Sequence, residues 1–438
     1  MNQLKKYKQS TKMNVKFIDS DELYKKFLNP NSMLVKIHDH IDFSFVNELC
    51  QDVYSPDGQH AYLPELCFKV SFIQLFKGGL SDNEVVRQCQ TNMEYRYFCD
   101  LAIDDELFDD CKLSRFRDEL GIERFKRIFE EVVDRIKNAG FISEQDVQYM
   151  DSFLFLADVK VISINALIAK AIKQCLDDLK KTDSEMENDI KRRDFELSEE
   201  EQKQRFVFLV RKAQEILSNI KRINNLSKEA RQSLAPLKKI VRERVEISDD
   251  DIRKKESGEE KDKIVNITDP DARMMGKDRQ DILPRYKSHV AMNQNGFITY
   301  TNATLATVYD GHHASLMIAD LKGRGFTVPQ AVGDTHFGDI LLREAMSKEN
   351  TQIIAPYRKN QAMNSCLTND TMIEAWAYNQ THEYKEHRRI RAHIEPKQGE
   401  MKNIHGMKRA RLRGIDNVRI QNYLSAIVTN CKRWVYCS

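Results

Sequence analysis

One short segment constrains the fold of this chain more than any other, because it interrupts helical sequence with a run typical of a buried strand. Residues 148–164 read QYMDSFLFLADVKVISI and are dominated by β-branched and aromatic residues. Asp151 lies inside this apolar run. Burying an unpaired carboxylate is costly, so its presence here favours a functional role. Asp158, seven residues further on, is the second candidate in the same segment.

The sequence before this strand predicts an all-helical region up to about residue 140. Residues 64–77 are strongly apolar, open with a proline and are followed by Gly78 and Gly79, which is typical of a helix with a clear start and stop. Ser81 and Glu84 match a capping box that begins a second helix. A third helix is predicted by apolar residues at helical spacing, namely Ile122, Phe125, Phe129, Val132 and Ile136.

The sequence after the strand predicts a helical insertion followed by alternating strands and helices. Residues 166–263 are rich in charged residues, and apolar residues become sparse over 249–263, so we expect helices that end in a mobile charged linker. Asn295 and Gly296 predict a two-residue hairpin turn between strands over 286–293 and 297–307. Asp310 can cap the next helix, which runs through residue 321. The remaining pattern is a short strand over 327–332, a helix over 340–346 and a strand over 352–355, the order of an α/β layer fold.

Composition sets broad limits on the class of protein. The 438 residues include 69 Lys and Arg against 67 Asp and Glu, so affinity for a polyanion has to come from local clusters of charge. Nine cysteines form no CxxC pair and give an odd count, which favours reduced thiols. The first residues, MNQLKKYKQSTKMNVKF, lack the apolar core of a signal peptide, and no apolar run is long enough to cross a bilayer. We therefore expect an intracellular protein that has no membrane partner.

Three carboxylates are placed where metal-dependent phosphoryl transfer needs them. Asp151 lies in the first strand, and Asp334 directly follows a later strand, at the strand end where open α/β sheets bind ligands. Glu395 lies four residues after Arg391 and seven before Lys402, spacings that lie near one face of a helix. Carboxylates that hold paired metal ions supply the positioning and charge stabilisation on which phosphoryl transfer depends.

Basic residues surround the third carboxylate. Between residues 391 and 414 there are seven Lys or Arg and two acids, a balance that favours contact with phosphate. These cations are Arg391, Lys397, Lys402, Lys408, Arg409, Arg411 and Arg413.

These residues carry a family resemblance. The pattern R-x3-E-x6-K at Arg391, Glu395 and Lys402, followed by HGMKRARLRG, resembles the C-terminal Y-x2-R-x3-E-x6-K signature of the DDE-type transposases of bacterial insertion sequences. YMDSFLFLAD around Asp151, TDPDARMM over 268–275 and the DTHF segment at Asp334 resemble further motifs of that family. The helical N-terminal part, through LPELCFKVSFIQLFKGGLSDNEVVRQC and LSRFRDEL, resembles the amino-terminal domain of the same enzymes.

The resemblance implies an architecture. It is a helical N-terminal domain followed by a ribonuclease H-like, mixed-sheet catalytic domain of the α+β or α/β class. On this interpretation residues 1–140 form a DNA-binding domain, residues 141–165 and 264–438 form the catalytic domain, and residues 166–263 form a helical insertion and linker.

The resemblance also implies an activity. Two Mg²⁺ or Mn²⁺ ions are bound by Asp151, Asp334 and Glu395, and double-stranded DNA is bound through Arg391, Lys402, Lys408, Arg409, Arg411 and Arg413. The substrates are the terminal inverted repeats and target DNA, with no small-molecule substrate, handled by a homodimer in a synaptic complex. The expected location is the bacterial cytoplasm, on the nucleoid when bound to DNA.

Two positions depart from the family pattern and keep an alternative open. Arg388 occupies the place of the family's tyrosine, and Pro396 directly follows Glu395, so we expect a helix to begin there with Glu395 at its threshold. An inactive DNA-binding protein derived from a transposase is therefore the first rival. A helical scaffold protein, suggested by the charged stretch over 166–263, is the second, although that stretch lacks sustained heptads.

The histidines and cysteines predict no zinc site. His312, His313, His336, His382 and His387 have no cysteine or histidine partners at ligand spacing, and Cys366 is the only cysteine between Asp334 and Glu395.

Overall fold

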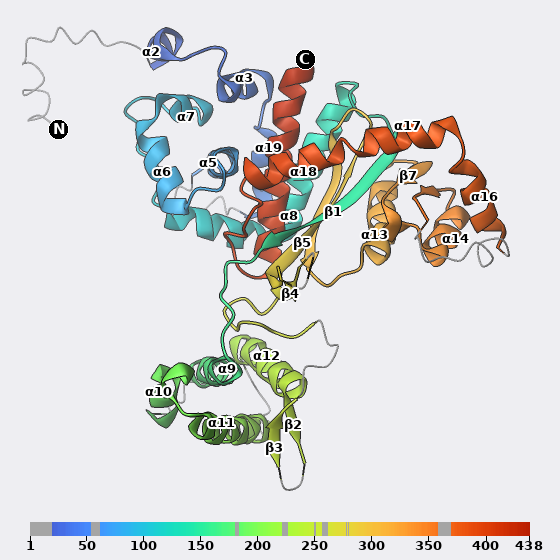
Figure 1. Cartoon of the computed structure of the whole chain (residues 1–438). Helices are drawn as coiled ribbons and strands as arrows, with labels where there is room; N and C mark the ends of the chain where they lie inside the picture. Colours follow the sequence, from blue (N-terminus) through green and yellow to red (C-terminus); the bar gives the residue numbers. More distant parts are fainter. Residues whose placement is uncertain are drawn as a thin grey trace, which may run out of the picture.

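The structure, a computed structural model, describes residues 20–53, 62–179, 184–220, 227–248, 251–255, 262–276, 278, 280–357 and 369–438. Figure 1 shows two parts: helices packed around a curled sheet, and a smaller helical unit that hangs from one end of the sheet. Two parts of the chain used in the sequence analysis lie outside the described residues: the N-terminal segment 1–19, expected to hold no signal peptide, and Cys366, expected to bind no zinc.

The first region is all-helical, as predicted. Pro64 opens its most apolar helix, and that helix ends before Gly78 and Gly79, whose φ angles of 86° and 80° few other residues adopt. Ser81 Oγ accepts a hydrogen bond of 3.2 Å from the N–H of Glu84, which caps the next helix. The helices are α2 (Ser20–Phe27), α3 (Met33–His40), α4 (Phe45–Leu49), η1 (Gln51–Val53), α5 (Pro64–Phe76), α6 (Asp82–Thr91), α7 (Met93–Phe98) and α8 (Cys111–Asn138).

A six-stranded mixed sheet forms the centre of the molecule. Its strands are β1 (Gln148–Leu156), β4 (Arg273–Met275), β5 (Leu283–Met292), β6 (Ile298–Leu305), β7 (Gln330–Val332) and β8 (Gln352–Ile354). The order is β4-β5-β1-β7-β8, and β6 also pairs with β5. β1 is antiparallel to β5 and parallel to β7, so the central strand joins an antiparallel half to a parallel half. This mixed sheet with its helical N-terminal region has the predicted ribonuclease H-like class of fold.

Helices cover both faces of the sheet. Neighbouring residues of a strand point to opposite faces, so the contacts of β5 and β6 show which helix lies where. Asn422 contacts Ser288 and Thr301 on one face, whereas His313 contacts Tyr300 on the other. The elements of this half are α13 (Asp310–Gly323), η3 (Thr335–Phe337), α14 (Ile340–Lys348), α16 (Asp370–Tyr378), α17 (His382–Arg391), α18 (Ile394–Asn403) and α19 (Ile415–Cys437).

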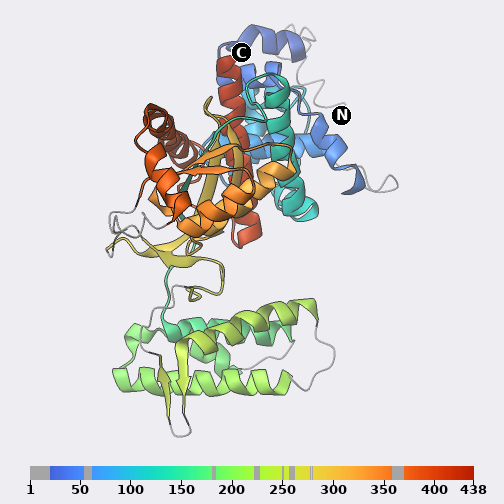
Figure 2. The ribbon, with the colours of Figure 1, turned by 90° about the vertical axis from the view of Figure 1, so that its right-hand side faces the viewer.

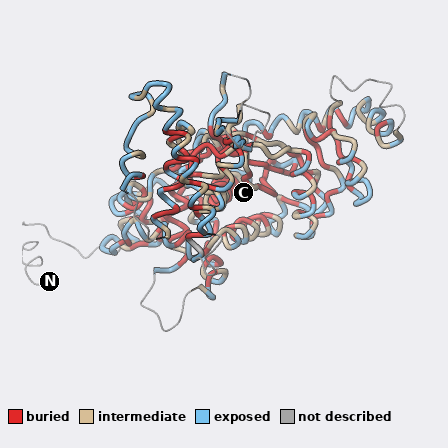
Figure 3. Tube along the Cα trace, turned by 90° about the horizontal axis from the view of Figure 1, so that it is seen from below, coloured by how far each residue is buried: buried red, intermediate tan, exposed pale blue. Residues whose placement is uncertain are grey.

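One hydrophobic core unites the N-terminal helices with the sheet. It runs from Leu34 in α3 to Cys431 in α19 and includes Phe125 and Phe129 of α8. The helix α19 lies between α8 and β6, and its residues from 420 to 431 are all buried, so it forms the centre of this core (Figure 3). The core positions predicted in the last helix, Ile420, Leu424, Ile427, Val428 and Cys431, are confirmed.

The insertion is a separate unit with its own core. It contains α9 (Ile164–Asp178), α10 (Ser184–Lys191), η2 (Asp194–Glu196), α11 (Glu199–Ile220), α12 (Lys228–Arg244), β2 (Val245–Ile247) and β3 (Ile252–Lys254). This second core contains buried residues from all three long helices, among them Leu167 of α9, Leu209 of α11 and Leu237 of α12. In Figure 2 the unit lies below the sheet and is joined to it by two stretches of chain.

The strand predicted over 148–164 is shorter than expected. It ends at Leu156, which pairs with Arg285. The next residue of β5 is Pro284; its C=O accepts a hydrogen bond of 2.9 Å from the N–H of Ala157, but proline has no N–H with which to continue the ladder. The apolar residues beyond it pack the connection instead: Val159 packs on the main core, and Ile162 on the core of the insertion.

The hairpin predicted at Asn295 and Gly296 is present, since β5 and β6 are antiparallel neighbours. Its turn is longer than the predicted two residues: the chain reverses over residues 293–297 with Gly296 at φ 74°, and the Asn293 side chain accepts a hydrogen bond from the N–H of Phe297 that stabilises the longer turn. Within the charged linker predicted over 249–263, the described residues 251–255 contain β3, which pairs with β2 and carries the Arg253 to Glu246 ion pair, whereas residues 249–250 and 256–261 lie outside the described residues.

The described cysteines are free thiols, and six of the eight are buried. In the part of the chain that the structure describes, no helix has the length and apolar character needed to cross a bilayer.

We predict that Asn430 is an anchor between α19 and the sheet. Its side chain accepts from the N–H of Ile298 and donates to the C=O of Ile298, both at 2.8 Å, where the pairing of β5 with β6 is irregular. Asn430→Ala leaves both backbone groups buried and unpaired and should lower the free energy of unfolding by roughly 2–5 kcal/mol. Denaturant unfolding measures this loss. Asn417→Ala, near the exposed start of the same helix, is the control, and equal stability of the two variants contradicts the prediction.

Candidate catalytic site

The pairing of two parallel strands brings Asp151 and Asp334 together. β1 and β7 pair with Gln148 opposite Ala331 and Tyr149 opposite Val332. Continuing this register by two residues places Asp151 opposite Asp334, at the point where β7 has ended and the chain turns into η3. Residues that face each other across neighbouring strands lie about 5 Å apart. Two carboxylates far apart in sequence therefore lie side by side on neighbouring inner strands of the sheet.

The Asp151 carboxylate is buried in surroundings that do not fully balance its charge. Its side chain is 16% exposed; Oδ1 accepts a hydrogen bond of 2.9 Å from the N–H of Ser152, and Oδ2 lies 3.5 Å from Nη1 of Arg391. Burial raises the pKa of Asp151 to about 6, and the negative charges of Asp334 and Asp310 add to the rise, whereas the Ser152 N–H and Arg391 oppose it. A carboxyl group held in this way gains from a cation placed beside it.

Asp334 keeps part of its carboxylate accessible. It caps η3, because Oδ1 accepts a hydrogen bond of 2.8 Å from the N–H of His336, and its other oxygen lies 3.5 Å from Nδ1 of the same histidine. The side chain is 32% exposed. The second aspartate is thus fixed by its own turn and open to solvent on one side.

The helices α17 and α18 run along the same face of β1 as Asp151. Tyr149, Asp151 and Phe153 alternate along the strand and so share a face. The hydroxyl of Tyr149 lies 3.0 Å from Nδ1 of His387, Arg391 pairs with Asp151, and Nζ of Lys402 lies 4.7 Å from the ring centre of Phe153. Arg391 and Lys402 therefore both lie beside β1, although the helix between them is interrupted.

Glu395 lies on this helical segment but does not complete the cluster. α17 ends at Arg391 and α18 begins at Ile394, so Pro396 sits in the first turn of a new helix, close to the predicted start. Ile394 is fully buried, whereas Glu395 is exposed. Within the described residues, Asp151, Asp334 and Glu395 do not form a group whose ligand atoms all lie within 4.8 Å of one another. Asp151 and Asp334 are neighbours across β1 and β7, whereas Glu395 is exposed on α18 and does not join them.

Asp310, which the sequence predicts to cap a helix, is a further carboxylate near the aspartate pair. The cap of α13 is Tyr309, and the Asp310 side chain instead pairs with Nζ of Lys287 at 3.1 Å and lies 3.6 Å from Nδ1 of His289. The prediction was wrong because a lysine on β5, distant in sequence, attracts the carboxylate. Asp310 is the third charge that Asp151 senses, and no local pattern in the sequence indicated it.

The basic segment after α18 lies at the far end of β1. The N–H of Leu156 bonds to the C=O of Lys408 at 3.1 Å, and the N–H of Ala410 bonds to the C=O of Leu156 at 2.7 Å, so the segment adds a short parallel pairing to the strand. Lys408 and Arg411 are exposed and make no ion pair in the described part of the chain.

Asp158, the second candidate of the sequence analysis, belongs to this basic segment and not to the aspartate pair. Its carboxylate lies 3.5 Å from Arg409 and 3.2 Å from Arg413; both arginines are exposed and Asp158 is half-buried.

The TDPDARMM motif has a structural role. The N–H groups of Gly414 and Ile415 at the start of α19 donate to Asp269 Oδ1 and Asp271 Oδ2 at 3.1 and 3.0 Å. Asp269 also accepts from the hydroxyl of Tyr286 on β5. Carboxylates at a helix N-terminus are favoured by the helix dipole, so this motif fixes α19 to the sheet.

Within the described residues, no histidine belongs to a group of three ligand-type residues whose ligand atoms lie within 4.8 Å of one another. His313 is buried and stacks on His289 with ring centres 3.9 Å apart, and burial lowers the pKa of His313 to about 4. The group of ligand-type residues that does come together in the described chain is Asp109, Asp110 and Cys111, three consecutive residues at the start of α8.

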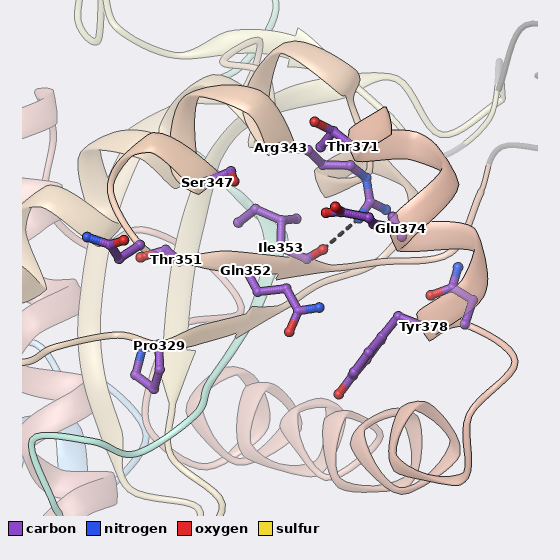
Figure 4. Close-up of a pocket in the computed structure, with 12 residues that line it drawn as sticks. Pro329, Arg343, Ser347, Thr351, Gln352, Ile353, Thr371, Glu374 and Tyr378 are labelled. Atoms are coloured by element: carbon purple, nitrogen blue, oxygen red, sulfur yellow. Dashed lines mark hydrogen bonds between the residues drawn. The ribbon is translucent and has the colours of Figure 1, made fainter. Parts of the chain in front are cut away.

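A polar pocket of about 420 Å³ lies away from the carboxylates, at the edge strand β8 (Figure 4). Arg343 from α14 lines it and donates to the C=O of Ile353 and of Ala355 at 2.6 and 2.8 Å. These bonds satisfy backbone groups that an edge strand otherwise leaves open. The pocket is thus explained by the closure of the sheet edge.

Comparison with known families places the chain among the transposases. The family described as "Transposase domain (DUF772)" matches residues 22–119, and the family "Transposase DDE domain" matches residues 251–431. The second match contains Asp334 and Glu395, and together the two cover well over half of the chain. The protein belongs to the DDE-type transposases. No curated protein and no solved structure gave a match.

We predict that the charge of Asp151 lowers stability when no metal is bound. The folded pKa of about 6 lies above the unfolded value of about 4, so the folded state is favoured below pH 4 and loses that advantage as the pH rises through 6. Asp151→Asn removes the buried charge and should raise the free energy of unfolding at pH 7 by about 2–4 kcal/mol, with little change at pH 4. Denaturant unfolding with a chelator present measures both. A variant that is less stable than wild type at pH 7 contradicts this prediction.

Proposed function

We propose that this DDE-type transposase is an active enzyme that cuts and rejoins DNA at the ends of an insertion sequence. Asp151, Asp334 and Glu395 are its catalytic residues. The observation that carries the proposal is the register of β1 with β7, which sets Asp151 beside Asp334 in a half-buried position where their charges are not balanced.

The two aspartates fit a divalent metal ion. Hard cations such as Mg²⁺ and Mn²⁺ prefer carboxylate oxygens, and two neighbouring carboxylates with one arginine beside them retain net negative charge. The proposal is that Asp151, Asp334 and Glu395 hold two such ions. When bound, the ions polarise a phosphate oxygen and make the attacking hydroxyl more nucleophilic.

The chain's own residues supply the remaining steps. Arg391 is positioned between Asp151 and solvent, where its guanidinium can bind a phosphate oxygen when DNA arrives. Lys402, two strand residues further along β1, can bind the next part of the backbone. Glu395 lies in the first turn of α18, just after the interruption at residues 392–393, and the proposal requires that it approaches the pair when metal is bound.

The basic segment extends the proposed DNA path along β1. Lys408, Arg409, Arg411 and Arg413 follow Arg391 and Lys402 in space as well as in sequence, from Asp151 towards the end of the strand. A row of exposed cations is the feature that binds the phosphate backbone without reading sequence. We also propose that the helical region over residues 1–140 binds DNA. The proposed catalytic domain comprises residues 141–165 and 264–438, and the proposed insertion comprises residues 166–263.

Recognition of terminal inverted repeats by a homodimer follows from the transposition reaction, because two element ends have to be joined to one target. We propose such a synaptic complex for this protein, acting on chromosomal DNA in the cytoplasm.

A DNA-binding protein that has lost catalysis is the second candidate. It is favoured by the exposed position of Glu395, by Pro396 beside it and by Arg388 in place of the family's tyrosine. Wild-type protein that binds the element ends but leaves them uncut with either Mg²⁺ or Mn²⁺ supports this candidate.

The test is strand cleavage on DNA that carries the ends of the element encoding the protein. Asp151→Ala, Asp334→Ala and Glu395→Ala should each lower metal-dependent cleavage by roughly a thousandfold or more, because each removes a metal ligand, while band-shift assays show binding largely intact. Glu374→Ala, which removes an exposed carboxylate on α16, is the matched control and should cleave like wild type. Cleavage by the Asp334→Ala protein at the wild-type rate refutes the assignment.

A further inference from the structure

We propose that the outer face of α12 in the insertion is a second binding site for the phosphate backbone of duplex DNA, separate from the basic segment beside β1. This inference rests on the proposed function, because it assumes that DNA is the substrate. It assigns a role to the insertion, for which the proposed function gives none.

Three cations define this face: Arg231, Lys238 and Arg242. Their spacings of seven and four residues place them within about 40° of one another around the helix, and about 10 and 6 Å apart along its axis. All three are exposed, whereas Ser233, Leu237 and Ile240 are buried on the opposite side. The described charged residues on the face that points away from the core of the insertion are thus all basic.

These cations have no carboxylate partner among the described residues. Their neighbour Lys239 shows the contrast, since it lies 3.1 Å from Asp262 and 3.5 Å from Glu243. Glu243 is itself buried and accepts a hydrogen bond from the N–H of Ile264. The charge of Arg231, Lys238 and Arg242 is therefore available to an outside anion.

The helix dipole accounts for only part of this charge. Basic residues in the last turn of a helix are favoured by its dipole, and Arg242 lies in the last turn of α12. Lys255 adds to the same end, because its Nζ donates to the C=O of Arg242 at 2.9 Å. Arg231 and Lys238 lie well before that turn, so the dipole does not explain them.

Two groups of acids in the insertion lie on other helices. α10 carries Glu185 and Glu187, and α11 begins with Glu199, Glu200 and Glu201. In both Figure 1 and Figure 2, α12 lies nearer to the sheet than α11 does. The basic helix is thus on the side of the insertion that is closer to the catalytic carboxylates.

The position of the insertion fits DNA that leaves the basic segment. The connection into the insertion begins directly after β1, and Arg413 pairs with Asp158 in that connection. DNA that follows the cations along β1 is therefore led to the base of the insertion, where α12 can bind a further stretch of backbone.

The test measures affinity of the full chain for a 30-base-pair duplex of unrelated sequence at several salt concentrations. The triple variant Arg231→Gln, Lys238→Gln, Arg242→Gln should bind roughly ten- to a hundredfold more weakly near 0.1 M salt. Its plot of log affinity against log salt should also be less steep, with a slope smaller in magnitude by about 2 to 3. The control is Lys191→Gln, Lys203→Gln, Arg211→Gln, which removes the same charge from exposed positions on α10 and α11 and should bind like wild type.

A second measurement does not depend on substitutions. Acetylation of lysines in the wild-type protein should be slowed at Lys238 when duplex DNA is added, and unchanged at Lys203. Equal affinity and salt slope for the two triple variants, or equal protection of the two lysines, overturns the inference. Metal-dependent cleavage by wild-type protein then still supports the proposed function, whereas wild-type protein that binds no DNA overturns both.

Discussion

The parallel pairing of β1 with β7 is the constraint on which the rest of the site depends. A one-residue change in this register turns every side chain of a strand to the other face, so only the observed pairing sets Asp151 beside Asp334. The cost of that arrangement is a buried carboxyl group with a raised pKa. A protein that keeps two negative charges together in a half-buried place, with one arginine beside them, is prepared to bind cations at that point.

The surrounding helices hold this register in place. α19 crosses the antiparallel half of the sheet and is fixed there by buried amides, Asn422 to Ser288 and Thr301, and Asn430 to Ile298. The aspartates of the TDPDARMM motif hold the N-terminus of the same helix. Because α19 also packs on α8, the N-terminal helices and the catalytic sheet share one core, and the DNA-contacting surfaces proposed on them are rigidly related.

The sequence predicted those parts of the fold that depend on local pattern. The strand that carries Asp151, the helix opened by Pro64 and the helix start near Pro396 follow from apolar periodicity and from the conformational limits of proline. Contacts between distant residues could not be predicted in this way. The true end of β1 depends on Pro284, and the role of Asp310 depends on Lys287, both of them residues of β5.

The third carboxylate shows the same limit. The spacing of Arg391, Glu395 and Lys402 was read as one helical face, and the structure does bring the two cations to β1. The interruption between α17 and α18 nevertheless turns Glu395 to solvent, because Ile394 takes the buried position in the first turn. The proposed metal-dependent catalysis therefore requires that Glu395 joins the aspartates when metal and DNA are bound.

Anomalous diffraction from crystals of the protein grown with Mn²⁺ and DNA tests that requirement most directly. If the three residues bind the metal as proposed, manganese peaks lie between the carboxylates of Asp151 and Asp334, and the Glu395 carboxylate has moved to bind one of the ions. Manganese bound elsewhere, or bound by the aspartates while Glu395 still faces solvent, contradicts it.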